Sequence, residues 1–375
     1  MFLAVREMRR AKVRFGLLAA AIGLLLFLIL TQQAIQNGLL TAFVGAIERQ
    51  SAPVLVYGTD GQRTLQGSVI APPLERRIRA VPGVAAAGRI GQSTFTVRVG
   101  GGADSDAAII GYDRADLGAP DELSAGRLPR AAGEAVGSAA DFSLGDRLRV
   151  QVAGAPGGAG GTLRVVGLAP DAQLQVTPTL FVAWPDYLAA VEAANPDVTT
   201  VLPSALGVRP APGVSAAALA RRVNDASEDA DALTRSDAAR KSPGVAQVRQ
   251  SFRVIFLLYG LVAPLVTGLF FLIVTFQKSA ALTLLRAIGA RSTVLVRSLL
   301  VQVLLVICGG LALGVALYTP LSQMTLGSIT LRFDANAVVF WSVLLLALGL
   351  LSAVVAARRV LRIDPIEATT GGGAR

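Results

Sequence analysis

Long apolar stretches and one extended mixed segment set the pattern of this 375-residue chain. Three stretches, at 254–276, 299–318 and 338–357, contain no Asp, Glu, Lys or Arg. Each has about the 20 apolar residues that a helix needs to cross a bilayer. A fourth, at 15–30, is only roughly 24 Å long at 1.5 Å per residue, so it must recruit the residues that follow or thin the membrane. The pattern therefore predicts four transmembrane helices, the first at 15–36.

The segment before the first span, 1–14, carries five basic residues. Such a leader also begins secretory signals, but the apolar core behind it is long for a signal and no small-residue cleavage pattern follows. Its apolar residues Phe2, Leu3, Val5 and Met8 would face away from its arginines on a helix. We therefore favour a cytoplasmic amphipathic helix at the membrane surface over a plain basic flank.

The helical pattern continues beyond the first span. Ile35, Leu39, Phe43 and Ile47 recur at four-residue steps, which indicates a helix with one packed face. The Ser-Ala-Pro sequence at 51–53 would end it. The first helix is therefore predicted to extend out of the membrane as a stalk.

The segment between the first two spans, 37–253, mixes short strand patterns with amphipathic helices. We expect a helix from Ser215 to pack on strands near Val54 and Leu206, with a separate β-rich part at about 105–195. The predicted fold is an α-helical membrane protein with four transmembrane helices and a large α/β extracytoplasmic domain between helices 1 and 2. Strands are expected at 54–57, 93–99, 107–111, 148–152, 162–168 and 180–183, helices at 73–81, 184–194 and 215–230, and a flexible hairpin tip at 154–161.

The net charge of +10 lies at the membrane boundaries. Residues 37–250 carry 20 basic and 21 acidic side chains, so the excess comes from the short segments beside the spans. This distribution is the positive-inside bias and argues against nucleic-acid binding. It places the N-terminus, the loop 277–298 and the tail 358–375 in the cytoplasm, and the large domain and the loop 319–337 outside.

The composition excludes several kinds of site. The chain has no histidine, which removes His-based metal sites and Ser-His or Cys-His catalysis. Its single cysteine, Cys308, lies in the third span, so the outer domain has no disulfide. The acidic residues Glu228, Asp229 and Asp231 are typical of a solvated helix face. We therefore expect no catalytic, metal or cofactor site on this chain.

The loop 277–298 between spans two and three contains an apolar ridge formed by Leu282, Leu285 and Ile288. Gly289 can end that helical turn in a left-handed conformation. The ridge would seat in a groove on a cytoplasmic partner; the alternative is an amphipathic anchor lying on the lipid headgroups. The candidate coupling residues are Leu282, Leu285, Arg286, Ile288, Gly289 and Arg291.

Two glycines in the third span are candidates for helix packing. Gly310 and Gly314 are four residues apart, so they lie on one face of a helix and would let another helix approach closely. Such spacings also arise by chance in spans rich in Ala and Gly. The pattern alone leaves both interpretations open.

Four segments of the chain resemble the FtsX/MacB-like ABC permease family. Leu-Leu-Arg-Ala-Ile-Gly-Ala-Arg at 284–291 resembles its loop signature, 356–368 its terminal segment, and the basic run 9–14 its entry into the first span. Outside, Ile-Arg-Ala-Val-Pro-Gly-Val at 78–84, with Gly-Arg-Leu-Pro from residue 126, is similar to its MacB-type periplasmic domain. The matches occur in the family's order and span the chain.

The resemblance implies a permease subunit that transmits ATPase motion across the membrane to the outer domain. The chain has no Gly-x-x-x-x-Gly-Lys-[Ser/Thr] sequence, so ATP and Mg²⁺ are expected on a separate ABC ATPase subunit. The other expected partners are a second permease copy or paralogue forming a dimer, membrane lipid, and an extracytoplasmic protein. The task would be export or extraction of a lipid-associated or peptide-like substrate, or control of an outer partner, at the bacterial plasma (inner) membrane. A non-transporting receptor or scaffold is the alternative.

Overall fold

The computed structural model describes residues 12–151, 161–277, 292–326 and 329–361. The predicted surface helix at 1–14 lies almost entirely outside these residues. All of the expected tip at 154–161 except Gly161, and all six candidate coupling residues, from Leu282 to Arg291, also lie outside them. The chain forms two compact units, a helical unit of Met1–Gln36, Gln250–Met324 and Leu331–Arg375 and a sheet unit of Asn37–Arg249 and Thr325–Thr330.

The helical unit contains four helices long and apolar enough to cross a membrane, within the described residues. Phe15, Leu18 and Ile22 of the first helix pack against Val303 and Ile307 of the third. The prediction of four membrane helices is confirmed. The helices are α2 (Lys12–Glu48), α8 (Val245–Gln277), α10 (Ser292–Leu321) and α11 (Ala335–Leu361).

Two of these helices, α2 and α8, belong to both units, since the chain leaves one unit and enters the other within each of them. The predicted stalk is therefore part of α2. The helix ends at Glu48, close to the Ser-Ala-Pro sequence expected to stop it.

The sheet unit is built on ten strands in one hydrogen-bonded sheet, in the order β10-β1-β9-β2-β3-β8-β5-β7-β4, with β6 pairing β2 and β7. Its helices are η1 (Thr59–Gly61), α3 (Pro72–Ala80), α4 (Ala115–Gly118), α5 (Trp184–Ala194), α6 (Ala216–Ala226) and α7 (Arg235–Lys241). The strands are β1 (Val54–Gly58), β2 (Val84–Val99), β3 (Asp104–Tyr112), β4 (Ala125–Gly126), β5 (Glu134–Ser138), β6 (Arg147–Val150), β7 (Thr162–Ala169), β8 (Thr179–Ala183), β9 (Ala205–Pro210) and β10 (Ala230–Thr234).

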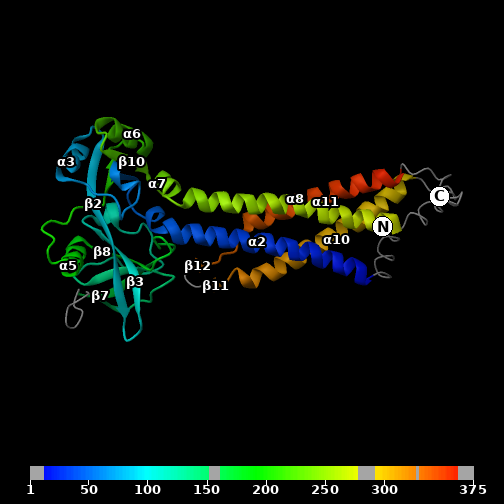
Figure 1. Cartoon of the computed structure of the whole chain (residues 1–375), viewed down its shortest axis with the longest axis horizontal. Coiled ribbons are helices and arrows are strands. Elements are labelled where there is room, and N and C mark those ends of the chain that lie inside the picture. Colours follow the sequence, from blue (N-terminus) through cyan, green and yellow to red (C-terminus); the bar gives the residue numbers. More distant parts are fainter. Residues whose placement is uncertain (1–11, 152–160, 278–291, 327–328, 362–375) are drawn as a thin grey trace. The chain divides into compact units, whose positions relative to one another are not determined.

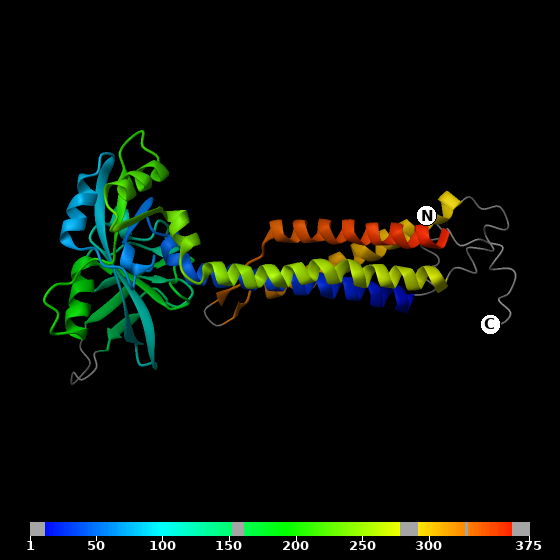
Figure 2. The same ribbon diagram turned by 45° about the horizontal axis from the view of Figure 1, so that its top comes forward.

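Strands β10, β1, β9 and the start of β2 form the α/β part of the unit. Val54 pairs with Val208, and Leu219 and Val223 of α6 pack in the same core as these strands. Figures 1 and 2 show α3 and α6 side by side over this part. The helix begins where expected, because the Ser215 side chain accepts a hydrogen bond from the Ala218 N–H at 3.2 Å.

The remaining strands close into a ring. Following the pairings, β2, β3, β8, β5, β7 and β6 return to β2, so six strands form a small barrel-like ring. Its apolar core includes Phe95, Ile109, Leu148 and Leu180. Tyr187 of α5 packs in the same core. Closure removes free strand edges, which protects a β-rich segment from pairing with other chains.

The expected separation of the β-rich part is wrong, because β2 belongs to both parts. This strand has 16 residues, and it contributes Ala87 to the α/β core, Ile90 to a second core and Phe95 to the core of the ring. The sequence pattern marked only its second half, 93–99. The small residues of its first half carry little strand propensity, and pairing with β9 makes them a strand.

The expected helix 215–230 is too long, because α6 ends at Ala226 and β10 begins at Ala230. β10 lies at the edge of the sheet, and Asn224 of α6 covers it. The Asn224 side chain donates to the Ala232 carbonyl at 3.1 Å and accepts from the Ala232 N–H at 2.6 Å. At this edge, the backbone N–H and carbonyl of Ala232 therefore bond to a side chain instead of to a further strand.

A buried ionic contact joins α3 to β2. The Glu75 carboxylate is 7% exposed and accepts hydrogen bonds from Arg89 Nε at 2.9 Å and Arg79 Nη2 at 2.8 Å. Burial raises the pKa of Glu75, but the bonds from Arg89 and Arg79 outweigh it and hold the pKa below its ordinary value. This contact therefore stabilises the fold at neutral pH and is lost as the pH falls through the lowered pKa.

The end of α2 should stabilise the sheet unit when that unit is isolated. Val44 and Ile47 are at most 4% exposed and pack in the second core, and burial of such a side chain is worth about 1.5–3 kcal/mol. Each kcal/mol corresponds to about 2–4 °C for a domain of this size. A soluble fragment 37–249 should therefore melt on the order of 10 °C above a fragment 50–249 in circular dichroism. Equal melting temperatures would show that α2 contributes nothing to this core.

Candidate functional site

Within the helical unit, the candidate packing glycines of α10 lie against α2. A Cβ placed on Gly310 would lie 2.7 Å from the Ala19 carbonyl oxygen, and one on Gly314 would lie 2.6 Å from the Gly23 carbonyl oxygen. The contact is mutual, since a Cβ on Gly23 would lie 2.8 Å from the Gly310 carbonyl oxygen. No side chain fits at these distances, so the two backbones touch here because the residues are glycines.

In the sheet unit, the last turns of α2 contact the loop 170–178 between β7 and β8, which we name the clasp loop. Its backbone bonds to the helix backbone at three points. The Ala46 N–H donates to the Gln173 carbonyl at 2.8 Å, and the Gln175 and Val176 N–H groups donate to the Phe43 and Ala42 carbonyls at 2.8 and 2.9 Å. The loop is thus fixed to the helix main chain.

Gly45 permits this approach. A Cβ at this position would lie 2.0 Å from the Asp171 carbonyl oxygen, closer than any real contact. The Asp171 side chain also pairs with Arg49, its Oδ2 lying 3.3 Å from Arg49 Nη2. A glycine one turn before the end of α2 therefore sets the distance between the helix and the clasp loop.

The clasp loop has an unfavourable backbone conformation. Asp171, Gln175 and Val176 have φ angles of 55°, 53° and 61°, in the left-handed region that glycine adopts readily and a β-branched residue very rarely. Each such residue costs on the order of 1–3 kcal/mol. The surrounding bonds hold the loop in place, including those of Thr179, whose Oγ1 accepts from the Leu174 N–H at 2.9 Å.

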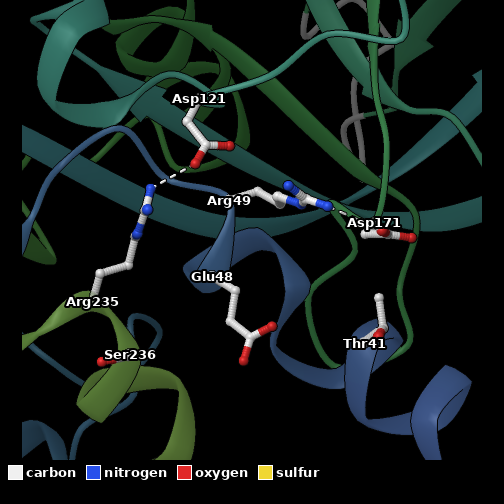
Figure 3. A pocket seen from close by; sticks show the side chains of 7 residues that line it. All are labelled: Thr41, Glu48, Arg49, Asp121, Asp171, Arg235 and Ser236. Atoms are coloured by element: carbon white, nitrogen blue, oxygen red, sulfur yellow. Dashed lines mark hydrogen bonds and ion pairs between the residues drawn. The ribbon is translucent and has the colours of Figure 1, made fainter. Parts of the chain in front are cut away.

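A charged hollow of about 460 Å³ lies beside the clasp loop (Figure 3). Arg49 of the stalk end pairs with Asp171 and, at 3.1 Å, with Glu122. On the other side, Arg235 at the start of α7 pairs with Asp121 at 2.7 Å. The hollow is lined by Thr41, Glu48, Arg49, Asp121, Asp171, Arg235 and Ser236.

Gln50 follows α2 and is fully buried. Its backbone carbonyl accepts a short hydrogen bond from Arg235 Nη1. Both polar atoms of its side chain lack a hydrogen-bond partner among the described residues. An unsatisfied buried amide costs about 1–3 kcal/mol. The junction between α2 and the sheet therefore combines strained backbone, a buried unpaired amide and ion pairs that hold it in place.

Sequence reasoning missed this junction. The stalk pattern identified the apolar face containing Phe43 and Ile47, but it gave no weight to Gly38 and Gly45. These glycines are seven residues apart and lie on nearly the same face of α2, and each costs helix stability relative to alanine. Glycines at that spacing within an otherwise helical stalk were a usable signal that something approaches the helix closely.

Comparison with known proteins identifies the helical part of the chain. Residues 253–365 match the family model of the FtsX-like permease C-terminal domain. This part of the chain is an FtsX-like permease C-terminal domain. The whole chain is 23% identical over 374 residues to an uncharacterised ABC transporter permease of Mycobacterium tuberculosis, with 99% of each chain covered. ABC transporter permeases are thus its homologues along its whole length.

A second relative matches a shorter part of the chain. A putative hemin transport system permease protein of Staphylococcus epidermidis, HrtB, is 28% identical over 112 residues, which is 30% of this chain. The alignment spans about a third of that relative, 32% of its length.

Two solved structures align with about half of the chain. One is the periplasmic region of MacB from Actinobacillus actinomycetemcomitans, with 12% identity, a TM-score of 0.35 and coverage of 52% of this chain and 95% of that one. The other is the extracellular domain of the ABC-type transporter YknZ from Gram-positive bacteria, with 16% identity, a TM-score of 0.32 and coverage of 49% and 100%.

The packing role of Gly310 can be tested with a neighbouring glycine as the control. Gly310→Ala should place a methyl group against the α2 backbone and destabilise the helical unit by about 1–3 kcal/mol, as overpacking does. Gly309→Ala should have little effect, because a Cβ there meets nothing within 4 Å. Thermal unfolding of the two purified variants in the same detergent measures the difference. Equal melting temperatures would mean that the contact at Gly310 contributes no stability.

Proposed function

We propose that this permease transmits motion from a separate ABC ATPase to its sheet unit, which acts on the extracytoplasmic side. The supporting observation is that α2 and α8 each run without a break from residues of the helical unit into residues of the sheet unit. A continuous helix carries a displacement or rotation along its length, whereas a flexible loop absorbs it. The function is therefore mechanical coupling across the membrane.

The absence of charged residues in three of the spans supports this mechanism over a hydrophilic conduit. The spans 254–276, 299–318 and 338–357 contain no Asp, Glu, Lys, Arg or His, and transporters that conduct ions or protons place such groups within the helix bundle. We infer that the cargo does not pass through a polar channel. The cargo is instead a lipid-associated or peptide-like substrate that is handled at the outer face. The alternative is that there is no cargo and that the sheet unit controls an extracytoplasmic partner.

The partners follow from the same mechanism. The ATPase, which holds ATP and Mg²⁺, binds the cytoplasmic loop 277–298 through the ridge of Leu282, Leu285 and Ile288. A second permease copy or paralogue completes a dimer. The basic segments at 1–14 and 358–375 lie on the cytoplasmic side of the bacterial plasma membrane with that loop.

The proposed orientation has a direct test in a background with Cys308→Ala. Gly101→Cys, at the exposed tip between β2 and β3 where a Cβ meets nothing within 4 Å, should react with a membrane-impermeant thiol reagent in intact cells. Ser292→Cys should react only after the cells are opened. Labelling of Ser292→Cys in intact cells, with Gly101→Cys protected, would reverse the orientation.

The ATPase contact should fail when a charge is placed on the ridge. Leu285→Asp or Ile288→Asp would desolvate a carboxylate in an apolar contact, at a cost of several kcal/mol. We expect the ATPase to be lost from the purified complex, and ATP turnover per inserted permease to fall at least tenfold. Loss of Arg286 or Arg291 should weaken binding less and in a salt-dependent way.

The matched control is Ala287→Asp, which adds the same charge on the other face of the predicted helix. It should leave co-purification close to wild type. If Leu285→Asp and Ile288→Asp permeases reach the membrane in equal amounts and still retain the ATPase at full stoichiometry, the loop is a headgroup anchor. Mechanical coupling would then be rejected, and a receptor or scaffold would remain.

A further inference from the structure

The clasp loop joins α2 to the strand ring. The loop is held to α2 by three main-chain hydrogen bonds, at Ala42, Phe43 and Ala46, and by the close contact at Gly45. Because these contacts involve backbone on both sides, no flexible side chain can take up a movement of the helix. A displacement of this part of α2 must therefore move the loop or break the bonds.

The other side of the clasp loop is fixed to the ring by a partly buried polar network. Gln173 Nε2 donates to the two Asp141 carboxylate oxygens at 2.9 and 2.7 Å, and Ser138 Oγ donates to Asp141 Oδ2 at 2.5 Å. Ser138 is the last residue of β5 and is 1% exposed. The Thr179 N–H, at the start of β8, donates to Ser138 Oγ at 3.2 Å. The loop is thus tied to two strands of the ring.

The chain itself connects α2 to another part of the sheet. Residue 48 ends the helix, and β1 begins at Val54, in the α/β part. Along the chain, movement of α2 therefore reaches β1 first. Across space, Val44 and Ile47 share an apolar core with Val136 of β5 and Phe181 of β8, and the clasp loop adds main-chain hydrogen bonds between α2 and this side of the ring. The strained φ angles of Asp171, Gln175 and Val176 are compatible with this role, because a loop released from α2 would relax to another conformation.

We propose that the clasp loop is the connection through which movement of α2 reaches the β5 and β8 side of the strand ring, and that opening it uncouples the ring from the stalk. The inference rests on the proposed function, and it identifies the contact that delivers the motion. The clasp loop then has two states, one closed on Gly45 and one open and relaxed, and the stalk determines which is populated.

The first experiment asks whether Gly45 keeps the clasp closed in the full-length permease. In Gly45→Ala, the new methyl group displaces the Asp171 carbonyl, so hydrogen exchange of a peptide covering 171–178 should become at least tenfold faster in mass spectrometry. Gly16→Ala is the matched control, since it is the same substitution in the same helix at a site where a Cβ meets nothing within 4 Å. Unchanged exchange at 171–178 in Gly45→Ala would overturn the proposal.

The second experiment measures coupling in the permease co-purified with its ATPase, with and without a non-hydrolysable ATP analogue. In wild type and Gly16→Ala, the nucleotide should change the exchange of β5 and β8 peptides. In Gly45→Ala that response should fall at least fivefold, while ATP turnover stays within twofold of wild type. If the nucleotide changes the exchange of the β5 and β8 peptides in Gly45→Ala as much as in wild type, the proposed role of the clasp loop is overturned. A wild type without any nucleotide response in the sheet unit overturns the proposed function instead.

Gln173→Met provides a second variant in case Gly45→Ala does not fold. It removes the bonds to Asp141 from the ring side and leaves the α2 surface unchanged. The expected result is the same loss of the ring response, with ATP turnover retained. A wild-type ring response in folded Gln173→Met would show that the clasp loop does not carry the motion.

Discussion

Close backbone contact with α2 is the constraint on which much of this structure depends. A helix is normally separated from its neighbours by side chains, and only glycine lets another backbone touch it. In α2, Gly23 meets α10 and Gly45 meets the clasp loop. Gly38 meets the hairpin of β11 (Thr325–Leu326) and β12 (Ile329–Thr330), where a Cβ would lie 2.6 Å from Ile329 Cγ2. One helix is therefore held by main-chain contacts in each unit.

The sheet unit combines a stable strand framework with an energetically unfavourable junction between α2 and the sheet. The ring of six strands has no free edge among its pairings, Asn224 covers the edge of β10, and β2 contributes to three apolar cores. Where α2 enters, by contrast, Gln50 is buried with an unpaired amide and three residues of the clasp loop have positive φ. Such costs persist only where the surrounding structure overcomes them, and they are concentrated at the place where the stalk meets the sheet.

This arrangement is consistent with the proposal that the chain transmits motion across the membrane and does not form a polar channel. The spans provide helices and close packing, and α2 and α8 continue into the sheet unit. The ion pairs of Arg49 and Arg235 hold the junction at its charged side, and the clasp loop holds it at the ring side. If the clasp loop has the two states proposed for it, a small helix movement would be converted into a change elsewhere, because packed contacts shift between discrete arrangements.

The sequence by itself determined the features that depend on composition and local periodicity. Three apolar runs of bilayer length and a shorter one at 15–30 predicted the membrane helices, the four-residue repeat from Ile35 predicted the stalk, and Ser215 marked the start of α6. The tertiary structure decided what depends on distant pairing. β10, which the sequence pattern did not mark as a strand, becomes an edge strand beside β1, and β2 joins parts expected to be separate, because strand pairing overrides weak local propensity. The clasp loop had no local signal, since its conformation is imposed by the backbone of α2, more than 120 residues earlier in the chain.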